Sequence, residues 1–236
     1  MEQFKFSLGP YELFASIIGG IPLVLALSIV YTPAISLQDV PVLIQKTLST
    51  QIIIILILFS YIVGALIQGI TWKYFLILCR IFSRDYQYFS GKLIFSKKKQ
   101  FEETEKNIDP QTLEFEDKII LLLHEKIGIP NNLDWLDSRL NTYLKEKNRP
   151  SLATAERYQA THIMYRNMSF GFLILGAVLF INLFRASIFT LEQWIFTLGS
   201  IALAYIAFLQ ALLLKQWYKR EILFGFYFAA YDDAQH

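Results

Sequence analysis

The sequence predicts an all-α polytopic membrane protein with four transmembrane helices, arranged as two pairs that are separated by a helical cytoplasmic insert. Hydrophobic residues make up 54% of the 236 residues, and the mean hydropathy of +0.39 is too high for an ordinary soluble domain. A helix of about 20 apolar residues crosses a bilayer core of roughly 30 Å. Four uncharged stretches are long enough for this, at 13–38, 47–72, 167–184 and 193–214.

The distribution of basic residues predicts the orientation. Between Lys73 and Arg166 lie 16 of the 22 Lys and Arg residues, whereas the connections within the two pairs hold only Lys46 and Arg185. Lys and Arg are enriched on the cytoplasmic side, so residues 73–166 and both termini are expected there. Three regions are predicted. The first transmembrane pair covers 1–84, with spans at about 13–33 and 50–72, and the insert covers 85–162. The second pair covers 163–236, with spans at about 167–185 and 193–214 followed by an aromatic cytoplasmic tail.

The first span contains Gly19, Gly20 and Pro22 near its middle. Proline removes a backbone donor and glycine relaxes the backbone, so we expect a kink or local unwinding there. Such a bend could act as a gate or line a pore. Alternatively, these residues allow close packing against a neighbouring helix, since glycine and proline are common in membrane helices.

The second span has small residues at helical spacing, Ser60 with Gly64 and Ala65 with Gly69. Small residues four apart let two helix backbones approach closely, which favours association inside a bilayer. Past Trp72 the helical pattern continues among charged and aromatic residues. This helix is therefore expected to project beyond the bilayer or to bend along its surface.

The insert is expected to be helical and, at about 80 residues, marginal as an independent domain. One helix is predicted over 108–128, with Asp109 as N-cap, Pro110 in the first turn and Gly128 at its end. The C-terminal tail carries a dense aromatic segment that would be an aggregation hazard if it were exposed. It is expected to pack on the cytoplasmic helices or on a neighbouring subunit.

The four uncharged stretches contain no Asp, Glu, Lys, Arg or His. Ion-coupled transporters generally need an ionisable group inside the membrane, so a coupled transporter is not expected. Three neutral polar side chains remain there, Gln68, Asn182 and Gln210. They are expected either to line a water-filled pore or to form hydrogen bonds between helices, within one subunit or between subunits.

The sequence lacks most signatures of enzymes. It has no phosphate-binding glycine loop, no nucleophile elbow, and no metal-ligand spacing among its three His and its single Cys79. We therefore expect no cofactor, no metal ion and no internal disulfide. The small net charge of +2 gives no reason to expect direct DNA binding.

One pair of residues is a candidate for catalysis. Arg157 and His162 have an Arg-x4-His spacing, and a ribonuclease can use His as general acid or base and Arg to stabilise phosphate charge. This motif resembles the HEPN signature, and its place beside membrane helices is similar to small membrane-pore accessory and effector proteins of bacterial CRISPR and antiphage defence. The resemblance implies a defence role by depolarisation of the bacterial inner membrane. Alternatively, Arg157, His162 and Arg166 lie at the level of phospholipid headgroups.

Three functions follow as expectations. The first is a homo-oligomeric channel or pore gated by the cytoplasmic helices, because one chain of this size could not enclose a wide pore alone. The second is a membrane-anchored adaptor that recruits a cytoplasmic protein or an RNA–protein complex. The third is a membrane-tethered HEPN-like ribonuclease.

Overall fold

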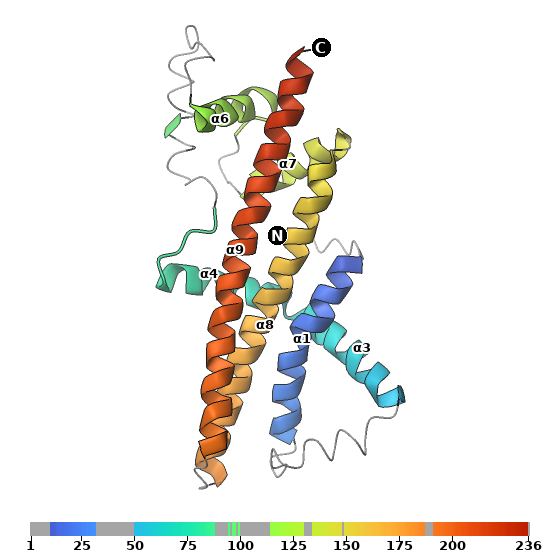
Figure 1. Ribbon diagram of the computed structural model, residues 1–236, viewed down its shortest axis with the longest axis vertical. Coiled ribbons are helices and arrows are strands. Elements are labelled where there is room, and N and C mark those ends of the chain that lie inside the picture. Colours follow the sequence, from blue (N-terminus) through green and yellow to red (C-terminus); the bar gives the residue numbers. More distant parts are fainter. Residues whose placement is uncertain are drawn as a thin grey trace. The chain divides into compact units, whose positions relative to one another are not determined.

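The computed structural model describes residues 10–31, 50–87, 94, 96–97, 99, 114–129, 134–147, 149–186 and 191–235. All regular structure in these residues is α-helical, which confirms the predicted all-α class (Figure 1). The helices are α1 (Pro10–Tyr31), α3 (Thr50–Leu66), α4 (Gln68–Ile81), α6 (Phe115–Lys126), α7 (Asp134–Glu146), α8 (Pro150–Ala186) and α9 (Leu191–Gln235). The predicted start of the helix at Asp109 and Pro110 lies outside the described residues.

Three of these helices are long and apolar enough to cross a membrane, namely α1, α8 and α9. Helices α3 and α4 meet the same test only together, and they are bent by 57° at a break between them. The protein therefore has three candidate spans, or four if the bent pair counts as one. The second span, expected over about 50–72, falls on this pair, whose helix is interrupted at Ile67.

The chain divides into two compact units. Unit 1 comprises Met1–Arg84 and Ala160–Leu212, and unit 2 comprises Asp85–Gln159 and Leu213–His236. Both α8 and α9 continue without a break from one unit into the other. The C-terminal segment, expected as a tail of the second transmembrane pair, thus belongs to the same unit as the insert.

In unit 1, α1 and α3 cross at two glycines. A side chain at Gly20 would collide with the backbone of Ser60, and a side chain at Gly64 would collide with the backbone of Ser16. Glycine therefore allows the two backbones to touch. Helix α1 runs unbroken through Pro22, so the expected local unwinding of the first span is not found.

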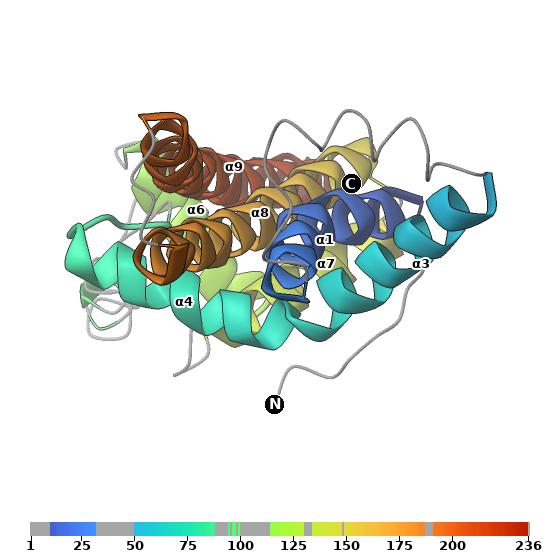
Figure 2. The same cartoon turned by 90° about the horizontal axis from the view of Figure 1, so that it is seen from below.

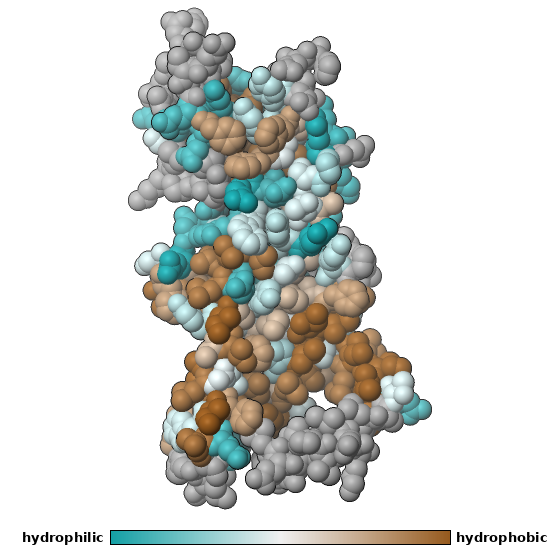
Figure 3. Space-filling view, viewed as in Figure 1, coloured by the Kyte–Doolittle hydropathy of each residue, from teal (hydrophilic) through white to brown (hydrophobic). Residues whose placement is uncertain are grey.

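Apolar side chains cover the outside of unit 1. Figure 3 shows them in brown over α1, α3 and the lower parts of α8 and α9. Along α3, every residue from Ile53 to Phe59 is exposed. An apolar surface of this extent is expected of helices that face lipid.

Unit 2 has a hydrophobic core of its own. It is built by α6, α7, the first turns of α8 and the last part of α9. Gly128 follows α6 with φ of +72°, a left-handed conformation that suits glycine and ends the helix as predicted. The aromatic C-terminal segment packs into this core through Tyr218 and Phe226, in agreement with its expected burial.

Candidate functional site: a polar network at the helix break

The interior of unit 1 contains a set of polar side chains around the break at Ile67. The carbonyl oxygen of Gly64 accepts a hydrogen bond from Asn167 Nδ2 at 3.1 Å. The carbonyl oxygen of Gln68 accepts one from Arg166 Nη2 at 3.2 Å. Two consecutive residues of α8 thus bind backbone carbonyls on either side of the interruption.

These contacts explain why a helix can be interrupted in an apolar surrounding. In a continuous helix the Gly64 carbonyl would accept from the amide of Gln68, four residues later. Here the bonds from Ile67 N to Val63 O and from Thr71 N to Ile67 O hold the helix on both sides of the break. A buried carbonyl without a partner costs free energy, so the Asn167 amide stabilises the bent backbone.

The donors are themselves linked. The Thr71 hydroxyl donates to Asn167 Oδ1 at 2.7 Å and accepts from Arg166 Nε at 3.2 Å. Gln68 Nε2 donates to Ser16 Oγ at 3.4 Å, which joins α1 to the same set. Thr71, Arg166 and Asn167 are all buried. We call the side chains of Ser16, Gln68, Thr71, Arg166 and Asn167 the break network.

Packing fixes the position of the network. A β-carbon at Gly19 would lie 2.8 Å from Cβ of Asn167, so this glycine makes room for the asparagine side chain. A β-carbon at Gly171, one turn further along α8, would lie 3.0 Å from Cβ of Pro22. The guanidinium carbon of Arg166 lies 5.4 Å from the ring centre of Trp72, within the range of a cation–π contact. Residues 19–22 therefore serve as a close-packing surface for α3 and α8.

The structure distributes the polar residues singled out in the sequence over different places. Gln68 belongs to the break network, whereas Asn182 is half-buried and Gln210 is exposed, both outside the network. Gly64 lies in the crossing with α1, and Ala65 is half-buried. A β-carbon at Gly69 would have no neighbour within 4 Å in the described chain, so packing of Gly69 against another subunit stays a prediction.

His162 and Arg166, expected at the level of phospholipid headgroups, are both buried in unit 1. His162 is 0% exposed, and its Nδ1 lies 2.8 Å from the carbonyl oxygen of Ala211. The rings of Trp72 and Phe75 pack edge-on against the imidazole. Arg157, in contrast, is exposed. A fully enclosed imidazole cannot reach an RNA phosphate, so this His does not form a ribonuclease site in the structure.

Sequence reasoning missed Ser16, Thr71 and Asn167, and it gave Arg166 a different role, at the level of the headgroups. One signal for them existed: Arg166 and Asn167 stand together at the beginning of the third uncharged stretch, where the apolar run of α8 starts. The residues that Arg166 and Asn167 contact are about 100 positions away in the sequence, so the local sequence pattern could not indicate these contacts.

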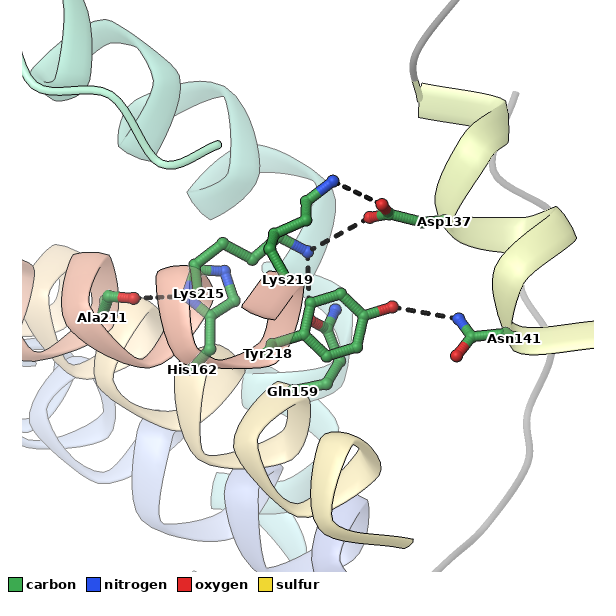
Figure 4. A network of polar contacts seen from close by, with 8 residues as sticks. All are labelled: Asp137, Asn141, Gln159, His162, Ala211, Lys215, Tyr218 and Lys219. Atoms are coloured by element: carbon green, nitrogen blue, oxygen red, sulfur yellow. Dashed lines mark hydrogen bonds and ion pairs between the residues drawn. The ribbon is translucent and has the colours of Figure 1, made fainter. Parts of the chain in front are cut away.

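Unit 2 contains a second buried polar group, the lysine cluster of Asp137, Asn141, Gln159, Lys215, Tyr218 and Lys219 (Figure 4). Lys219 Nζ lies 2.5 Å from Asp137 Oδ1, and Lys215 Nζ lies 4.0 Å from Asp137 Oδ2. Asn141 Nδ2 donates to the Tyr218 hydroxyl at 3.0 Å. The cluster thus attaches α7 to α9.

Lys215 makes two further contacts within unit 2. Its Nζ donates to Gln159 Oε1 at 3.1 Å and lies 4.4 Å from the ring centre of Tyr218. Both lysine side chains are buried, 7% exposed at Lys215 and 8% at Lys219. Two buried lysine side chains therefore lie within 4.0 Å of the same carboxylate, that of Asp137.

In the described part of the chain, no three His, Cys, Asp or Glu residues are close enough together to hold a metal ion. The comparisons with known proteins add no assignment, since no family model, curated protein or solved structure matches this chain. The break network is the candidate functional site because it combines buried charge, interrupted backbone and side-chain hydrogen bonds inside an apolar unit.

Proposed function

We propose that the protein is an oligomeric membrane channel whose opening is coupled to the bend between α3 and α4. The observation that carries this proposal is the pair of backbone carbonyls at Gly64 and Gln68 that accept from side chains of α8. Interrupted helices at membrane depth occur where the freed backbone groups have other partners or face a water-filled cavity. Breaks of this kind are frequent in proteins that move ions or solutes.

The break has two arrangements in which the Gly64 carbonyl is satisfied. In the bent form it accepts from Asn167, and in a straight form it would accept from the amide of Gln68 and release the asparagine. Such a pair of alternatives is the property required of a two-state switch. We assign the bent form to the closed channel.

The remaining features of the proposal concern assembly and control. A subunit with three or four spans could not enclose a wide pore alone, so we propose that several copies surround it. Helices α8 and α9 contribute to both units, which offers a route by which a change in unit 2 reaches unit 1. In a bacterial inner membrane, opening would depolarise the cell, the defence role that the HEPN-like resemblance implies.

The test is ion flux from liposomes that contain the purified protein, together with its native mass in detergent. Thr71→Val removes the hydroxyl that connects Asn167 and Arg166. Leaving a buried acceptor without its donor costs about 1–3 kcal/mol, which corresponds to at least about a 5-fold shift toward the straight form. We therefore expect Thr71→Val to raise the flux.

Thr197→Val is the matched control. Thr197 is also buried in unit 1, but its hydroxyl only donates to the Gln193 carbonyl of its own helix at 2.8 Å. The control should conduct like the wild type. Absence of flux from both the wild type and Thr71→Val, or a monomeric native mass, would reject the channel.

A membrane-anchored adaptor is the second candidate, and one observation favours it. Unit 2 exposes the aromatic side chains of Trp135, Phe228 and Tyr231, with Trp135 66% exposed on α7. Exposed aromatic groups are frequent in protein interfaces. Absence of ion flux from liposomes, together with loss of binding to a cytoplasmic partner in Trp135→Ala, would support the adaptor instead of the channel.

A further inference from the structure

We infer that α4 is an interfacial helix whose outer face binds anionic phospholipid headgroups. The inner face of α4 is marked by Thr71, Phe75 and Cys79, which are buried at a spacing of four residues. A spacing of four places these three side chains on one side of a helix. The opposite side of α4 and the turn that follows it are therefore free to face the surroundings of unit 1.

The outer face mixes isoleucine and cations. Ile70, Ile77 and Ile81 are each more than half exposed, and Lys73 and Arg80 are exposed between them. Arg84 is exposed just after the helix ends. This combination of large aliphatic residues and basic residues is typical of helices that lie in the plane of a membrane surface.

The packing of α4 places it at the end of the apolar part of unit 1. Figures 1 and 2 show α4 crossing α8 and α9 rather than running along them. The Tyr74 hydroxyl lies 3.1 Å from Ser169 Oγ, only two residues after the uncharged stretch of α8 begins. The ring centre of Phe82 lies 5.5 Å from that of Tyr205 and 5.8 Å from that of Phe208, both in the second half of the uncharged stretch of α9. If α8 and α9 cross the bilayer, α4 lies at one boundary of its hydrocarbon core.

The charges determine the chemistry of the partner. Among the described residues, no ion pair involves Lys73, Arg80 or Arg84, so their positive charge is available to an external anion. The neighbouring isoleucines require an apolar partner at the same time. A phospholipid leaflet with anionic headgroups meets both requirements, whereas RNA would leave the isoleucines in water. We therefore assign this face to anionic phospholipid.

Lipid binding on this face has a consequence for the break. Thr71, on the inner face of the same helix, belongs to the break network. Headgroups that hold α4 at the membrane surface thus stabilise the bent form of α3–α4. The lipid assignment rests on the two faces of α4 and is independent of whether the protein conducts ions.

The test titrates phosphatidylglycerol, and separately neutral phosphatidylcholine, into the full-length protein in detergent, and measures bound lipid by native mass spectrometry. Each basic group near an anionic surface raises the affinity about 5-fold. The double variant Arg80→Gln with Arg84→Gln loses two such groups, so its affinity for phosphatidylglycerol should fall about 30-fold. Binding of phosphatidylcholine should not change. Arg80→Lys with Arg84→Lys keeps both charges and should retain phosphatidylglycerol binding.

The matched control is Lys126→Gln with Lys145→Gln, which removes two exposed cations from unit 2. This variant should bind phosphatidylglycerol like the wild type. Equal loss in both double variants, or a wild type that binds both lipids alike, would overturn the inference. Preferential binding of a short RNA in competition with phosphatidylglycerol would overturn it as well, and would assign the face to nucleic acid.

Discussion

Gly64 and Gly69 are five residues apart, and they differ completely in what surrounds them. A side chain at Gly64 would enter the backbone of Ser16, whereas a side chain at Gly69 would meet no atom within 4 Å. The spacing of small residues in the sequence marked both glycines equally. Which of them contacts another helix depends on the position of α1, and the local pattern carries no information about that position.

This contrast gives a prediction about single residues. Gly64→Leu should destabilise unit 1 by about 1–3 kcal/mol or more, because the neighbouring atoms are backbone and cannot rotate away. Gly69→Leu should leave the melting temperature in detergent nearly unchanged. Thermal unfolding of both variants, followed by circular dichroism, is the measurement. Equal loss of stability in the two variants would show that Gly69 is also packed, for example against another copy.

At the scale of whole helices, much of the fold could be predicted from the sequence. Long uncharged stretches predicted α1, α8 and α9, since burial in lipid requires nothing more specific than length and apolar composition. The break at Ile67 could not be predicted in the same way. The uncharged stretch 47–72 continues through the break, and the interruption depends on competition for the Gly64 carbonyl by Asn167, from a distant part of the chain.

The candidate site was predicted least well for the same reason. Among the residues of the break network, Gln68 alone was singled out as a polar group inside a span, because a lone amide in an apolar run is visible locally. Arg166 lies one residue before the uncharged stretch, so counting charges placed it at the membrane surface. Its burial against Trp72 and the Gln68 carbonyl is a property of the tertiary structure.

The attachment of α7 to α9 leads to a prediction at this scale. Asp137→Asn keeps the shape of the side chain but removes the carboxylate that two buried lysines share. Loss of one partner from a buried ion pair costs about 3–5 kcal/mol, so unit 2 should unfold at a clearly lower temperature. Selective loss of protection in α7, measured by hydrogen exchange, would locate the effect.

Asp117→Asn serves as the control for this prediction. Asp117 also accepts from a lysine, Lys97, at 2.8 Å, but that lysine side chain is 27% exposed. More exposed pairs contribute about 0–1 kcal/mol, so this variant should remain close to the wild type in stability. Similar melting temperatures for the two variants would mean that burial of Lys215 and Lys219 does not increase the contribution of their ion pairs to stability.

At the scale of the whole molecule, the orientation in the membrane stays a prediction from charge distribution. Cysteines placed at Lys46 or Arg185 in a Cys79→Ala background should react with an impermeant maleimide added to intact cells. A cysteine at Lys98 should react only with a permeant reagent. The structure does not describe the side chains at these three positions, so the test is independent of it. Labelling of Lys98→Cys by the impermeant reagent would reverse the predicted orientation.

The native chain contains a single thiol, and it lies on the buried face of α4. Cys79 is 5% exposed in the structure. A thiol reagent can therefore reach it only during intervals in which α4 lifts away from its neighbours, and the reaction rate measures how often this happens. The rate at which a thiol reagent modifies Cys79 in the wild-type protein thus reports the opening of this one helix, and no cysteine has to be introduced or removed.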